Sequence, residues 1–135
     1  MAISKRLNRG ITSSFLTAAA IPKGSPVKLD TDSDYVVTST SSNDAAIIGV
    51  TADESAAGGS VDVIHFGVAP VRVQTASGVA VGNWLMQGTD AGEAVEIAAV
   101  AGTNYNAFAK VLVAPGADND LVTCLVCAGN TPAQG

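Results

Sequence analysis

The chain has few charged residues, few aromatic residues and little of the chemistry that enzymes carry. Only 14% of its 135 residues are charged and 4% are aromatic, although 47% are hydrophobic. It contains one histidine, His65, and none of the Walker loop, dinucleotide-binding glycine fingerprint or His-Glu-x-x-His motif. A low charged fraction indicates that partners cover some of the surface. We therefore expect no enzyme and no cofactor.

Cysteine is also scarce, and long apolar runs are absent. Cys124 and Cys127 stand three positions apart in LVTCLVC, which places them on opposite faces of a strand. A zinc site needs about four ligands, and His65 is the only imidazole that could join them. We expect two core thiols and no metal. No run approaches the ~20 apolar residues of a membrane span, so we expect no membrane partner.

The charges that are present are divided along the chain. Residues 1–29 contain five of the seven cations and no acid, and all twelve acids follow in residues 30–135. A basic front and an acidic body can attract each other between subunits. The acidic body argues against direct binding of nucleic acid, which needs a basic face.

Turn signals every eight to twelve residues predict an all-β sandwich or barrel. The stretch 47–73 is expected to form the central part of this fold, with a strand, a helical turn over 52–57, a corner at Gly58-Gly59 and a second strand. Thr51 and Glu54 have the spacing of a capping box for that turn. Gly67 predicts a bulge or barrel corner, and Pro70 predicts an edge position. The runs 108–113 and 121–127 lack clean alternation, which predicts strands buried on both faces.

The pattern divides the chain into three parts. Residues 1–20 form an N-terminal arm, for which Thr, Ser and Phe favour an extended strand and the alanine triplet favours a short helix. We expect the extended form. Residues 21–128 form a compact β-barrel or β-sandwich with one short helical turn, and residues 129–135 form a C-terminal tail.

Five short sequence blocks occur in an order that resembles a known protein family. They are IPKGSPVKL (21–29), IGVTA (48–52), GSVDV (59–63), VGNWL (81–85) and AKVL (109–112). Together they resemble the small capsid decoration, or cement, proteins of tailed bacteriophages. The resemblance covers about residues 20–127.

The resemblance implies a compact β-barrel, usually a homotrimer, made in the host bacterial cytoplasm and mounted on the outer surface of the virion. It implies binding to the major capsid protein at local threefold axes, which strengthens the shell against internal DNA pressure. It also implies an N-terminal arm that orders on docking. The residues expected to contact the capsid or a neighbouring subunit are Lys5, Arg6, Leu7, Arg9, Ile11, Phe15 and Leu16.

Two other interpretations remain open. A secreted β-sandwich that binds glycans or joins a surface layer would need exposed aromatic rings, for which Trp84, Tyr35 and Tyr105 are the candidates. A self-processing enzyme that cleaves at Gly24-Ser25 or Gly59-Ser60 would convert the serine to a pyruvoyl group. Pro26 disfavours the strained turn that this cleavage needs at Ser25.

Overall fold

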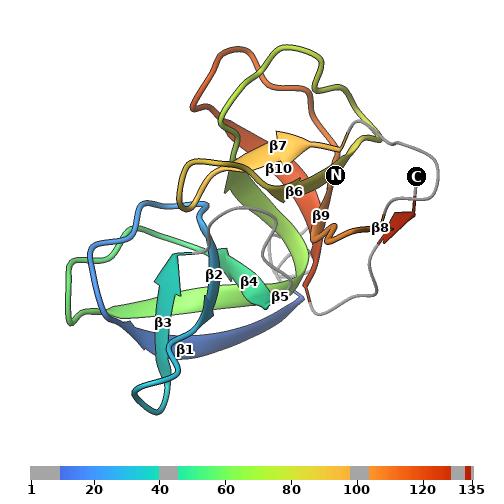
Figure 1. Ribbon diagram of the computed structural model, residues 1–135. Coiled ribbons are helices and arrows are strands. Elements are labelled where there is room, and N and C mark those ends of the chain that lie inside the picture. Colours follow the sequence, from blue (N-terminus) through green and yellow to red (C-terminus); the bar gives the residue numbers. More distant parts are fainter. Residues whose placement is uncertain (1–9, 40–45, 98–103, 129–132, 135) are drawn as a thin grey trace, which may run out of the picture.

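A computed structural model describes residues 10–39, 46–97, 104–128 and 133–134. Within these ranges the chain is all-β and contains no helix (Figure 1). The strands are β1 (Ile11–Thr17), β2 (Pro26–Leu29), β3 (Val36–Ser39), β4 (Ile47–Thr51), β5 (Ser60–Arg72), β6 (Trp84–Gln87), β7 (Ala94–Glu96), β8 (Asn104–Tyr105), β9 (Ala109–Val111), β10 (Leu121–Cys127) and β11 (Ala133–Gln134).

The first five strands close into a barrel in the order β1-β3-β2-β4-β5. Closure depends on β1, which pairs in parallel with β3 and antiparallel with β5. Figure 1 shows this barrel below the remaining strands. Its core is a separate cluster, with half-buried Phe15 and Ile48 packed against it; the buried members are Ile21, Val27, Val37, Val61 and Val63. The barrel alternative of the predicted fold class is therefore confirmed.

The long strand β5 belongs to two parts of the molecule. Its first half pairs with β1 and β4, and from Phe66 onward it pairs with β10. Gly67 sits at the change of partner with a φ of +134°, which a side chain would rarely tolerate. Residue 67 is thus the barrel corner that the sequence predicts.

Pro70 occupies the expected edge position. It faces Thr123 of β10, but the Thr123 carbonyl accepts from Leu112 N at 2.9 Å on the opposite side. Alternation in an antiparallel ladder then turns the Pro70 nitrogen away from β10. Among the described residues no other strand pairs with residues 67–72, so the missing N–H of proline removes no ladder hydrogen bond.

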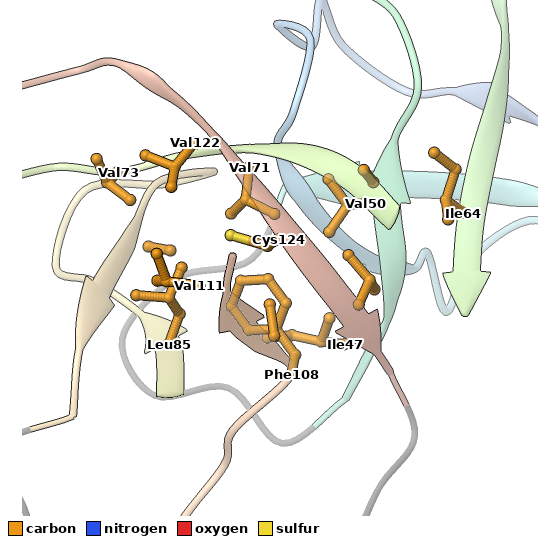
Figure 2. Packing of buried hydrophobic residues seen from close by; sticks show 14 of the residues in the cluster. Ile47, Val50, Ile64, Val71, Val73, Leu85, Phe108, Val111, Val122 and Cys124 are labelled. Atoms are coloured by element: carbon orange, nitrogen blue, oxygen red, sulfur yellow. The ribbon is translucent and has the colours of Figure 1, made fainter. Parts of the chain in front are cut away.

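A second lobe continues the sheet in the order β5-β10-β9-β6-β7. Gln74 N donates to Ala94 O at 2.8 Å, which brings β7 back beside the end of β5. Figure 2 shows Phe108 in the packed interior of this lobe. The buried cluster consists of Ile47, Val50, Ile64, Ala69, Val71, Val73, Val79, Leu85, Ala94, Phe108, Ala109, Val111, Val122, Cys124 and Val126.

The prediction that β10 is buried on both faces is wrong. Val122, Cys124 and Val126 are buried, whereas Leu121 and Thr123 are exposed. The outward residues are apolar or small, so the sequence hides an alternation that the strand follows. Cys124 lies in the core as a free thiol, and Cys127 is free and half-buried.

The helical turn predicted over 52–57 is also wrong. Ile21 and Ser55 exchange two backbone hydrogen bonds of 2.8 Å, and Ala52 N donates to Asp62 O. Thr51 caps no helix, because its Oγ1 donates to Pro22 O at 2.8 Å and accepts from Ser25 N at 3.0 Å. Contacts with distant parts of the chain therefore replace the local capping box. The predicted glycine corner does form, with Gly58 at a φ of +76°.

Candidate docking surface

Three of the expected contact residues lie on β1. Ile11 and Leu16 are 63% and 49% exposed, and Phe15 is half-buried against the barrel core. Lys5, Arg6, Leu7 and Arg9 lie outside the described residues. The division of the chain at residue 20 stays a prediction. Residues 11–17 of that arm are extended and contribute a barrel strand.

One edge of β1 is open over its first part. Thr17 N donates to Gly59 O and Leu16 N donates to Tyr35 O, both at 2.9 Å, so odd residues face β5 and even residues face the β3 side. The backbone groups of Thr12 and Ser14 therefore point away from β5. In the described part of the chain β3 pairs with β1 only at Leu16 and Thr17, which leaves that side of residues 12 and 14 without a strand partner.

A hollow of about 650 Å³ opens at the end of the barrel that β1 to β5 form. We call it the mouth pocket. It lies where β1, β5, the start of β4, the end of β10 and the turn between β2 and β3 meet. Its lining residues are Phe15, Leu29, Asp30, Ser33, Asp34, Tyr35, Ile47, Ile48, His65 and Ala128.

Aromatic rings organise the wall of the mouth pocket. Phe15 lies 6.4 Å from Tyr35 and 5.9 Å from His65, between ring centroids. His65 Nδ1 is 2.7 Å from Ile48 O and must donate the hydrogen bond, because a carbonyl oxygen only accepts. His65 is thus held in place by a hydrogen bond. The ring contacts connect β1 to β5 across the barrel end.

Tyr35 is the unusual residue of this wall. Its backbone has a φ of +56°, and its side chain is 75% exposed. A bulky residue in the left-handed region is uncommon and costs free energy, and such residues cluster at functional sites. The backbone of Tyr35 also accepts from Leu16 N, so the contact with β1 holds the residue in place.

The rim of the mouth pocket is acidic. Asp30 and Asp34 line it, and among the residues that the structure describes no lysine or arginine does. Asp30 Oδ1 accepts from Asp32 N at 2.9 Å, which stabilises the turn between β2 and β3. Within the described ranges, no three or more His, Cys, Asp or Glu residues gather as a metal site. An acidic rim above apolar walls favours an occupant that carries both positive charge and apolar side chains.

Of the residues proposed for other functions, Tyr35 lines the mouth pocket, whereas Trp84 and Ser25 lie elsewhere. Trp84 is half-buried, with Lys110 Nζ 5.4 Å from its ring centroid. Tyr35 is an exposed aromatic ring of the kind that a glycan-binding site uses. Ser25 is buried, and its Oγ donates to Pro22 O at 2.9 Å, so the hydroxyl already holds a turn.

The sequence did not predict that the residues of the mouth pocket lie close together. Leu29, Tyr35, Ile48 and His65 come from four separate segments, and their meeting depends on barrel closure. The alternating acids of the segment 30–34 were the one local signal.

The part of the chain that the structure describes has no helix of the length and apolar content that crossing a membrane requires.

Comparison with solved structures finds a similar fold in a phage head protein. The chain resembles the N base of head fiber gp8.5 in bacteriophage phi29, with a TM-score of 0.63 over 93% of this chain and 98% of that chain. The two sequences are 14% identical. No protein-family model and no curated protein matches this chain. At this identity the likeness establishes a shared fold.

Proposed function

We propose that this chain is a structural protein of a phage virion that binds the outer surface of the capsid as a trimer and stabilises the shell. The observation that carries the proposal is the fold, which it shares over nearly its whole length with the N base of a phage head fiber. The exposed strand β1 and the basic residues before it supply a docking surface. The major capsid protein is the proposed partner, and the protein is made in the host cytoplasm without enzymatic activity.

The proposed mechanism is multivalent docking. In a trimer the second and third arms bind intramolecularly, which raises the overall affinity without any new type of contact. The exposed side chains of Ile11 and Leu16 supply apolar area, and its burial contributes ~25 cal/mol per Å². A shell held at many such points resists outward pressure better than the capsid subunits alone.

Charge orients the docking. Lys5, Arg6 and Arg9 carry three positive charges within five positions, and no acid precedes Asp30. Cations of this kind steer association and set the register of the complex. Because exposed charges are screened within about 8 Å at physiological salt, we expect capsid binding to weaken as salt rises.

The test is co-sedimentation of the purified protein with heads of the phage that encodes it. Deletion of residues 1–9 should abolish binding and preserve the barrel, because the deletion ends before β1. Arg6→Glu should weaken binding, whereas Lys23→Glu, the same charge change at an exposed site outside the arm, should not. Full occupancy of the heads by the protein lacking residues 1–9 would overturn the role of the arm. Absence of binding by the intact chain would overturn the proposed function.

Tyr35 favours one second candidate, a glycan-binding module that is secreted or part of a surface layer. Its exposed ring could stack on a sugar, and Ser33 and Asp34 beside it could accept or donate hydrogen bonds. A glycan array probed with the intact protein tests this function. Binding that Tyr35→Ala abolishes would support it, and a silent array would remove it.

A further inference from the structure

We infer that the mouth pocket receives residues 1–9 of a second copy of this chain. The inference rests on the self-association in the proposed function and names the contact that produces it. It goes beyond capsid binding, because the same segment would join subunits to each other. Four observations carry it: the chemistry of the pocket, the chemistry of the segment, the point at which the chain enters β1 and the conformation of Tyr35.

The mouth pocket suits a short peptide. Its volume of about 650 Å³ lies within the ~300–1,000 Å³ typical of binding pockets. Phe15, Leu29 and Ile48 offer apolar contacts, and Asp30 and Asp34 place two carboxylates at the rim. An occupant that fits must therefore combine apolar side chains with cations.

Residues 1–9, MAISKRLNR, have that composition. If the segment binds in an extended conformation, Ile3 and Leu7 share one face, since side chains alternate along a strand. Lys5, Arg6 and Arg9 supply the cations, and the segment contains no acid. Fully extended, nine residues span about 30 Å, enough to cross from one subunit to a neighbour. The basic front of one copy thus complements the acidic rim of another.

The contacts of Gly10 and Ile11 fix the point at which the segment joins the barrel. Ile11 pairs with Phe66, and Gly10 packs so tightly on β5 that a Cβ there would lie 1.8 Å from Phe66 O. Gly10 is therefore held against β5 beside the Gly67 corner, and we propose that residues 1–9 reach from this point to the mouth pocket of a second copy. One arm and one pocket per copy make a heterologous contact, the type that closes into rings such as a trimer.

Tyr35 is the fourth observation. Its left-handed backbone holds an exposed ring above Phe15, where it would cover an inserted side chain. Such an arrangement costs stability in the isolated subunit and is explained if the ring contacts a partner. Aromatic residues are enriched among the positions that dominate binding energy at interfaces.

Charge reversal tests the contact in the full-length protein, with sedimentation velocity at low micromolar concentration. Arg6→Glu in the arm and Asp34→Lys at the rim should each lower the association constant about tenfold, which corresponds to ~1.4 kcal/mol. The double variant should recover to within about threefold of the original protein, because the charges again oppose each other. Glu54→Lys makes the same change at an exposed acid outside the mouth pocket, and it should neither weaken association nor rescue Arg6→Glu.

Two variants that remove proposed apolar contacts complete the test. Leu7→Asp and Tyr35→Asn should each reduce self-association, and asparagine tolerates the positive φ of residue 35. A trimer unaffected by these variants and by charge reversal would overturn the inference while leaving the proposed trimer intact. A protein that is monomeric at every concentration would overturn both the inference and the self-association. Intact self-association without binding to heads would instead overturn capsid docking.

Discussion

The ring of Phe15 meets the ring of His65 edge-on, with centroids 5.9 Å apart and planes at 78°. This contact joins β1, the strand that follows the basic segment in the sequence, to β5, the strand that both lobes share. Phe15 also packs against the barrel core. The wall of the mouth pocket and the closure of the first barrel therefore depend on the same side chain.

The first prediction concerns the hydroxyl of Thr51. Thr51→Val keeps the shape of the side chain and leaves the buried N–H of Ser25 without its acceptor. An unsatisfied buried donor costs about 1–3 kcal/mol, so the free energy of unfolding in urea should fall by that amount. Thr123→Val is the control, because Thr123 is an exposed threonine on β10. Equal unfolding free energies for the two variants would contradict the role of Thr51.

The second prediction concerns Gly49 on β4. A Cβ at this residue would lie 2.5 Å from both Ile64 O and Val63 Cγ1. The Ile64 carbonyl is fixed in the sheet, so Gly49→Ala should destabilise the protein by about 1–3 kcal/mol through overpacking. Gly116→Ala adds the same methyl group where the nearest atom is 3.7 Å away. Thermal unfolding should separate the two variants, and a neutral Gly49→Ala would show that β4 can shift.

The third prediction is a pH dependence from Cys124. Burial raises the pKa of the Cys124 thiol to about 12, above its ordinary value of 9.0. Below pH ~8.5 the thiol is protonated in both the folded and unfolded states, and its contribution to stability is fully present. Between pH ~9 and ~12 the unfolded chain releases this proton and the folded protein retains it, so stability falls as pH rises.

Urea unfolding from pH 8 to pH 11 measures this effect. The decline in stability should be smaller for Cys124→Ala than for the original protein. Cys127→Ala is the control, since Cys127 is half-buried. At pH 8, iodoacetamide should modify Cys127 faster than Cys124, because the attacking species is the thiolate. Modification of Cys124 at the rate of Cys127 in folded protein would contradict its burial.

The fourth prediction separates the arm from the barrel strand. Deletion of residues 1–17 should abolish cooperative unfolding, because β1 pairs with both β3 and β5 and its loss opens the barrel. Deletion of residues 1–9 alone should preserve a cooperative transition, because β1 begins at Ile11. Far-UV circular dichroism during urea unfolding measures both. A cooperative transition in the protein that lacks residues 1–17 would show that the barrel folds with its four remaining strands.

Much of the fold could be predicted because it depends on short-range patterns. Glycine corners such as Gly58 and Gly67 require conformations that few other residues adopt, and both lie where the sequence places them. The predicted helical turn failed for a physical reason. The capping-box spacing of Thr51 and Glu54 is a local preference, and it lost to hydrogen bonds with Pro22 and Ser25, which are distant in sequence.

The candidate site was predicted only in part. Ile11, Phe15 and Leu16 were expected as contact residues from the family resemblance, and that role stays a prediction. The structure places two of them at the surface and Phe15 in the mouth pocket. Tyr35 and His65 could not be assigned to that pocket. Their positions depend on strand pairings that span up to about half of the chain.

The sequence by itself determined that the chain is all-β, since the spacing of turns and the alternation of apolar residues are local properties. It also determined that positive charge gathers at one end and negative charge in the body. Only the tertiary structure decided that β1 closes a barrel and that Phe15, Tyr35 and His65 meet beside two acids. Strand pairing joins segments far apart in sequence, and the free energy that selects one pairing comes from burial of the whole core.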